Sequence, residues 1–151
     1  MRWGSEDGDA APMRALFVLA AVGFCGCLSL STNVRADFYT GKFAEARERC
    51  KGESERSCLV LRPCSALHMG DSAAAKEDAQ KTCAAKIPKD NVRFVTVLTR
   101  AYESTQQQTP AAEVTAAKKL FIEACGVDAA AVDADFEKTG KVTMGELMDS
   151  W

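Results

Sequence analysis

The residues best suited to chemistry lie near the C-terminus, where oxygen-bearing side chains recur at alternating positions and could together bind a calcium ion. Within the twelve residues 135–146, oxygen-bearing side chains stand at positions 1, 3, 5, 9 and 12, and position 7 can offer its backbone carbonyl. Ca²⁺ takes about six to eight oxygen ligands at roughly 2.3–2.6 Å. The sequence therefore predicts a calcium site, with Ca²⁺ as cofactor. Its candidate ligands are Asp135, Glu137, Thr139, Lys141, Thr143 and Glu146.

This segment resembles the calcium loop of the EF-hand family. Gly140 stands at position 6, where the loop must turn sharply, and Val142 stands at position 8. The resemblance covers residues 127–151 and implies a helix-loop-helix in which Glu146 offers both carboxylate oxygens. It also implies that Val142 forms a short strand that pairs with a second loop. No second loop precedes it, so a homodimer paired through Val142 is one expectation.

The loop departs from the family pattern in ways that imply weak binding. Position 3 is Glu137, where Asp or Asn is usual, and position 5 is Thr139. Only three carboxylates remain, and Lys138 and Lys141 lie beside them. Because extracellular and lumenal calcium is millimolar, a dissociation constant of about 10⁻⁴–10⁻³ M is still sufficient for occupancy there.

Residues 1–36 are typical of an N-terminal extension followed by a secretory signal peptide. A basic start at Arg14 precedes the 16-residue apolar run 15–30, and small residues at Val34 and Ala36 predict cleavage before Asp37. Met13 is an alternative start. The run is shorter than the roughly 20 residues of a membrane-spanning helix, so we expect no membrane span after signal removal. An uncleaved signal anchor and an organelle-import segment are alternatives.

The sequence from 37 to 126 predicts one helical domain. Apolar residues recur at helical spacing in several segments, and short turns with glycine or proline separate them. Thr109 and Pro110 are typical of a helix start, Gly126 of a helix end, and Pro63 is expected to kink or shorten its helix. The fold class is thus all-α: a small, disulfide-stapled bundle of antiparallel helical hairpins with a C-terminal helix-loop-helix of EF-hand type. The expected helices are 43–50, 58–69, 72–85, 92–102 and about 110–125.

Two stretches resemble tetratricopeptide or similar helical-repeat units. Residues 39–46 look like the turn and second helix of such a repeat, and residues 70–75 look like another. Their offset of 29 residues differs from the 34 of that family, and ordinary helix packing is the alternative explanation.

The cysteines agree with an oxidising compartment. Five of the seven follow the apolar run, which is dense for a cytosolic protein of this size. Cys58 and Cys83 are equidistant from the turn at residues 70–71, which predicts a Cys58–Cys83 disulfide. Cys50 with Cys64 is the weaker second expectation, and Cys125 then stays free or pairs with another chain.

Charge and motifs exclude several functions. The net charge of −2 does not favour nucleic-acid binding. His68 is the only histidine, and no nucleophile or phosphate-loop motif accompanies it, so we expect no enzyme. The first hypothesis is a secreted or lumenal calcium-binding protein. The alternatives are a calcium-independent helical module that binds an unknown protein partner, marked by an exposed apolar groove, and an accessory subunit in an organelle lumen.

Overall fold

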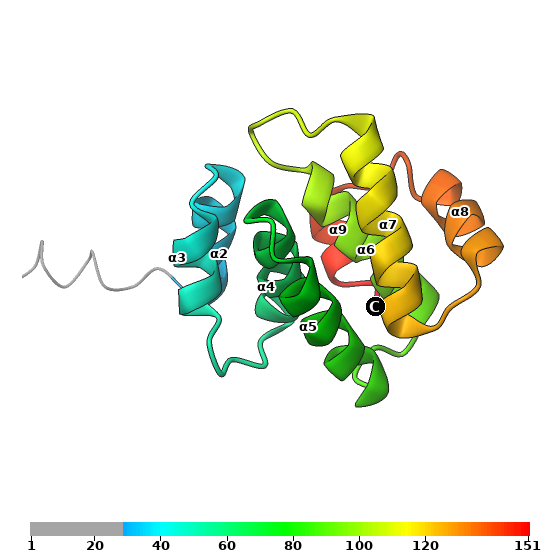
Figure 1. Ribbon diagram of the computed structural model, residues 1–151, viewed down its shortest axis with the longest axis horizontal. Coiled ribbons are helices and arrows are strands. Elements are labelled where there is room, and N and C mark those ends of the chain that lie inside the picture. The colour runs from blue at the N-terminus through cyan, green and yellow to red at the C-terminus, as the bar shows by residue number, and fades with distance from the viewer. Residues whose placement is uncertain (1–28) are drawn as a thin grey trace, which may run out of the picture.

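The computed structural model describes residues 29–151, and this part of the chain is all-helical (Figure 1). It has eight helices and no strand, which confirms the all-α class. The helices are α2 (Leu30–Tyr39), α3 (Phe43–Arg49), α4 (Arg56–His68), α5 (Ser72–Ala84), α6 (Asn91–Glu103), α7 (Ala111–Cys125), α8 (Ala129–Lys138) and α9 (Met144–Met148).

The first six of these helices form three antiparallel pairs, α2/α3, α4/α5 and α6/α7, which follow one another across the molecule (Figure 1). In each of the first two pairs a glycine in the left-handed region makes the tight turn, Gly41 at φ 85° and Gly70 at φ 81°. The stretches that resemble a helical repeat contain these two turns. The first helices of successive pairs pack together, α2 on α4 and α4 on α6, while α5 packs on α7.

Helix α6 lies at the centre of the packing, in contact with α4, α7, α8 and α9. Its Phe94 and Leu98 are fully buried, and Phe121 of α7 and Val60 of α4 are buried with them in the core. The side chain of Asp90 accepts hydrogen bonds from two backbone amides of the first turn and so begins the helix. The helix expected at residues 92–102 is therefore confirmed.

Pro63 does not shorten α4, which runs through it to His68. Pro110 is the N-cap of α7 and not its first residue. Gly126 ends α7 at φ 61°, as predicted.

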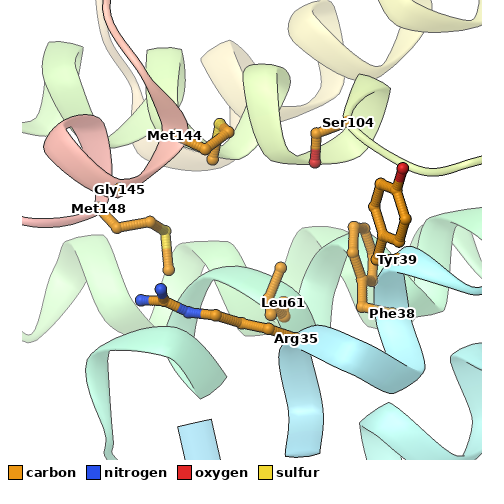
Figure 2. A pocket seen from close by; sticks show the side chains of 8 residues that line it. All are labelled: Arg35, Phe38, Tyr39, Leu61, Ser104, Met144, Gly145 and Met148. Atoms are coloured by element: carbon orange, nitrogen blue, oxygen red, sulfur yellow. The ribbon is translucent and has the colours of Figure 1, made fainter. Parts of the chain in front are cut away.

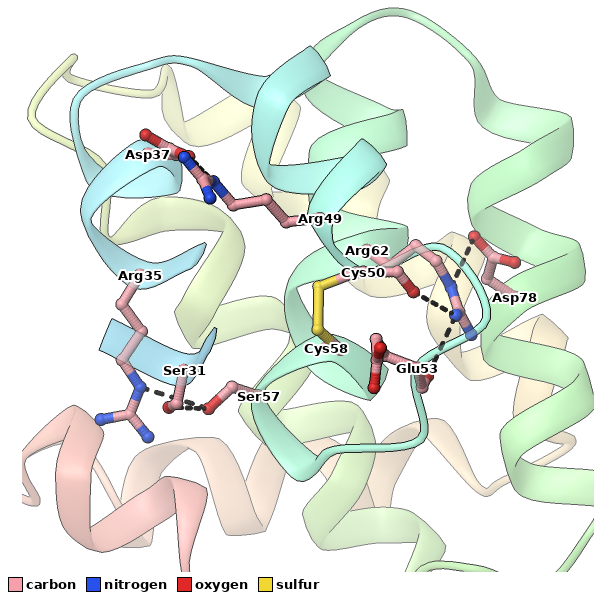
Figure 3. The surroundings of a disulfide bond; sticks show 10 residues. All are labelled: Ser31, Arg35, Asp37, Arg49, Cys50, Glu53, Ser57, Cys58, Arg62 and Asp78. Carbon is pink, nitrogen blue, oxygen red and sulfur yellow. Dashed lines mark hydrogen bonds and ion pairs between the residues drawn. A yellow bond between two sulfur atoms is a disulfide. The ribbon is translucent and has the colours of Figure 1, made fainter. Parts of the chain in front are cut away.

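Two disulfides staple the described chain, but their pairing differs from the prediction. Cys50 pairs with Cys58, and Cys83 pairs with Cys125 (Figure 3 shows the first). The equidistance of Cys58 and Cys83 from the turn places them level along α4 and α5, but the direction of each side chain around its helix decides its partner. Cys58 faces back to the end of α3, and Cys83 faces α7. Within residues 29–151 only Cys64 is free, and its buried thiol lies 3.2 Å from the carbonyl oxygen of Leu98.

The expected cleavage site lies inside α2. A cut before Asp37 would divide this helix and separate Val34, which is fully buried, from Phe38, which is 2% exposed. Ser29 caps the helix by accepting a hydrogen bond from the amide of Thr32. The described helices thus begin at Leu30, seven residues before the expected cut, and residues 15–28 of the apolar run lie outside the described residues.

A stack of three rings ties the three helix pairs together. The His68 ring of α4 lies between Phe43 of α3 and Tyr102 of α6, at centroid distances of 4.3 and 4.1 Å. Its Nε2 lies 2.8 Å from the carbonyl oxygen of Tyr102 and donates to it. Burial lowers the pKa of His68, and this effect exceeds the opposing effects of the Tyr102 carbonyl and Glu113.

The lowered pKa of His68 predicts a loss of stability in weak acid. The unfolded chain takes up the proton near the ordinary pKa of 6.5, before the folded protein does. The stabilisation is therefore complete above that pH and is lost as pH falls through the lower pKa of the folded state. Between about pH 7.5 and 5.5 we expect the free energy of unfolding to fall, by at most about 1.4 kcal/mol per pH unit.

Urea denaturation at the two pH values measures this change, and His68→Gln is the control because it removes the only histidine. The variant should be less stable at pH 7.5 but nearly insensitive to pH across this range. An equal slope in the wild type and the variant would assign the pH dependence to other groups.

Candidate functional site

The structure places the six predicted calcium ligands in α8, in the turn that follows it and at the start of α9. Asp135 and Glu137 lie in α8, which continues through the first four positions of the predicted loop. The Asp135 carboxylate accepts two hydrogen bonds from the Arg93 guanidinium of α6, at 2.9 and 2.8 Å. Burial raises the pKa of Asp135, but hydrogen bonds from Arg93 and Thr96 outweigh it and lower the pKa overall. The first predicted ligand is thus held against α6.

The middle of the predicted loop is the end of a helix. Thr139 is 3% exposed, and its hydroxyl donates to the Asp135 carbonyl at 2.7 Å. The Arg100 guanidinium lies over the Phe136 ring at 3.4 Å from its centroid and donates to the Phe136 carbonyl at 2.6 Å. These contacts fix α8 on α6. Lys141 is exposed, and Val142, 40% exposed, lies in a bend and not in a strand.

The last two predicted ligands bind each other. Thr143 and Glu146 form a capping box that begins α9: the Glu146 carboxylate accepts from the Thr143 amide at 3.0 Å and from its hydroxyl at 2.7 Å. These hydrogen bonds lower the pKa of the Glu146 carboxyl. Within residues 29–151 there is no group of three or more acidic, histidine or cysteine side chains that could hold a metal ion.

The Asp135–Arg93 pair gives a stability prediction that is separate from calcium binding. Asp135→Asn should lower the free energy of unfolding by about 1.5–3 kcal/mol, because it weakens a charge-assisted pair, and by the same amount with and without calcium. Thermal unfolding with added CaCl₂ or EDTA measures this, and Glu137→Gln, at an exposed position of the same loop, is the control. Saturable stabilisation by calcium that Glu146→Gln abolishes would instead support the EF-hand prediction.

The structure brings together another set of residues, which line an apolar groove between α2 and α9 (Figure 2). The groove holds about 300 Å³. One wall comes from α2 and the other from α9, and α4 and the end of α6 contribute one residue each. Its lining residues are Arg35, Phe38, Tyr39, Leu61, Ser104, Met144, Gly145 and Met148.

The groove has one charged side chain and open access to solvent. Arg35 is the only charged residue among its described lining residues. Tyr39 is 55% exposed at the rim, whereas Leu61 and Met148 are 5% and 4% exposed. The groove therefore presents preformed apolar surface with a cation at one side.

The sequence alone did not indicate this groove. In its α2 wall, Arg35 was assigned to the leader and Phe38 and Tyr39 to the helical domain. In its α9 wall, Met144 and Gly145 were assigned to a calcium loop. One pattern in the sequence could have indicated α2: Val34 and Phe38 lie one helical turn apart, which is typical of the buried face of a helix.

Family models, curated proteins and solved structures were compared with the chain, and none matches it. In residues 29–151 no helix is both long and apolar enough to cross a membrane. What can be inferred about function therefore comes from the helical fold, its disulfides and the groove.

Proposed function

We propose that this protein is a disulfide-stabilised helical module that binds a partner chain through the groove between α2 and α9. The observation that carries the proposal is the groove itself, an apolar hollow lined from four helical elements. No predicted calcium ligand lines it. Calcium binding by residues 135–146 stays a prediction, which thermal unfolding with added calcium tests.

The groove has the chemistry of a protein interface. Aromatic residues and methionine are enriched at such interfaces, and the groove has Phe38 and Tyr39 on one side and Met144 and Met148 on the other. Methionine side chains are flexible and adapt to different apolar surfaces. At about 300 Å³ the groove is at the lower limit of typical small-molecule pockets, which span about 300–1,000 Å³. Its size suits one or two anchoring side chains of a partner.

The disulfides support an oxidising compartment. Two disulfides are unusual in a small cytosolic protein and common in secreted and lumenal ones. We therefore assign the module to the extracellular space or an organelle lumen of the secretory pathway.

Site-specific photo-crosslinking in cells tests the proposal. A benzophenone amino acid at Tyr39, on the groove rim, should yield a discrete adduct, and the same probe at exposed Val142 should not. Gly145→Leu should abolish the adduct because it fills the groove. The fold should persist, because Leu favours a helix more than Gly does and a Cβ at this position meets no atom within 4 Å. An adduct that is insensitive to Gly145→Leu would place the partner elsewhere.

A further inference from the structure

We infer that the partner of the groove is a short amphipathic helix that carries an acidic residue beside its apolar anchors. This inference rests on the proposed function and specifies the partner class. It is built from three observations: the lack of an acidic partner for Arg35 among residues 29–151, the packing of α9 and Trp151, and the free space beside Gly145.

The guanidinium of Arg35 has no acidic partner among residues 29–151. Its Nε donates to the hydroxyl of Ser57 at 3.3 Å, and Ser57 also hydrogen-bonds Ser31 at 2.8 Å (Figure 3). By contrast, Arg49 on the neighbouring helix pairs with Asp37. Arg35 extends along the groove toward Met148 (Figure 2). A hydroxyl contact orients this cation without neutralising it, so a carboxylate on the partner would gain a charge-assisted hydrogen bond.

The helical form of the partner is inferred from a segment of the chain that packs beside the groove. The chain's own residues from α9 onward place apolar side chains at i, i+3, i+4 and i+7, as Met144, Leu147, Met148 and Trp151. Leu147, Met148 and Trp151 are at most 4% exposed. Trp151 lies on Phe94 of α6, and Arg56 at the start of α4 donates to the Met148 carbonyl at 3.4 Å. The starts of α4 and α6 therefore already hold a short helix, α9, and the Trp151 that follows it, and turn-spaced apolar anchors are the pattern of helix-in-groove recognition.

Gly145 allows a second helix to approach α9 closely. It lines the groove on the exposed side of α9, and nothing lies within 4 Å of the position its Cβ would take. A residue without a side chain leaves the backbone accessible to a partner. A partner helix can thus lie between α2 and α9, with its anchors over Leu61 and its acidic residue near Arg35.

Two fluorescently labelled helical peptides test this inference against the full-length chain. Both carry the same Leu and Met residues at i, i+3, i+4 and i+7, and they differ only in Glu or Gln beside these anchors. Fluorescence anisotropy should show about threefold to tenfold tighter binding of the Glu peptide, a difference that shrinks at high salt. Arg35→Gln should remove the difference, whereas Lys42→Gln, an exposed charge of the same helix pair outside the groove, should keep it.

The outcomes separate the inference from the proposed function. Equal binding of both peptides, lost in Gly145→Leu, would overturn the acidic-partner inference and leave the groove function intact. Failure of both peptides to bind, with the Tyr39 cross-link retained, would exclude this class of helix as the partner. Failure of both experiments would overturn the proposed function as well. A preference for Glu that survives in Arg35→Gln would also overturn the role of Arg35.

Discussion

Replacing Cys83 and Cys125 together by alanine should lower the free energy of unfolding by about 4 kcal/mol, one of the two largest losses expected for this fold. In the chain-entropy account a disulfide stabilises by restricting the unfolded chain, and the effect grows with the loop it closes. This disulfide joins residues 42 apart in the sequence. The Cys50–Cys58 disulfide joins residues only 8 apart, so its loss should cost less, about 2.5 kcal/mol.

Urea denaturation of the two double variants measures this difference, with Cys64→Ala as a third variant. Cys64 is buried but unpaired, so its replacement loses one sulfur atom and no cross-link. If loss of the Cys50–Cys58 disulfide lowered the free energy of unfolding more than loss of Cys83–Cys125, the stabilisation would come from the native state and not from loop closure. Equal losses in all three variants would mean that neither disulfide restricts the unfolded chain appreciably.

The two disulfides support different parts of the groove scaffold. The Cys83–Cys125 bond fastens α5 to α7 and so joins the second and third helix pairs. The Cys50–Cys58 bond closes the connection between α3 and α4, where Arg62 donates to the carbonyls of Cys50 and Glu53 (Figure 3). The Cys83–Cys125 bond holds the second and third helix pairs together. The Cys50–Cys58 bond fixes how the α2/α3 pair joins α4, and α2 of that pair forms one groove wall.

Local patterns in the sequence predicted most of the helices because these helices carry their own signals. The turn at Gly70 and the left-handed end at Gly126 are backbone requirements that the residue type reveals. Buried apolar residues at helical spacing identified α6 and α7. Such signals depend on neighbours a few residues away, and they hold when no distant residue competes with them.

The missed features depend on contacts between distant residues. Helix α2 follows directly on an apolar run, so its buried Val34 could not be distinguished from a leader residue by composition. Cysteine pairing depends on the angle around each helix axis, which equidistance from a turn does not determine. The Asp135–Arg93 pair spans 42 residues, and nothing near Asp135 indicates it.

The calcium-loop spacing shows why a motif depends on its structural context. Thr143 and Glu146 fit two sequence patterns. They stand at positions 9 and 12 of the predicted calcium loop, and their three-residue spacing is also that of a capping box. Gly140 stands where a loop would turn, but the backbone there is not in the left-handed region. In this structure the Asp135 carboxylate accepts hydrogen bonds from Arg93, and Thr143 and Glu146 begin α9.

Trp151→Ala should lower the free energy of unfolding by about 3–5 kcal/mol, the second large effect. Trp151 follows α9 and is only 4% exposed. Its ring lies on Phe94 at a centroid distance of 4.7 Å, and the Arg56 guanidinium lies over it at 4.8 Å. The replacement therefore removes a large buried ring and the anchor that holds α9.

Trp151→Phe is the matched control for this change. The indole Nε1 is buried without a hydrogen-bond partner in the described chain, so phenylalanine removes an unsatisfied donor while it keeps a ring on Phe94. We expect Trp151→Phe to cost less than half as much as Trp151→Ala in urea denaturation. Because α9 forms one groove wall, Trp151→Ala should also weaken the groove-binding peptides, and Trp151→Phe should not. A cost below about 1 kcal/mol for Trp151→Ala would mean that α9 is frayed in solution, and the groove would then have to form with its partner instead of before it.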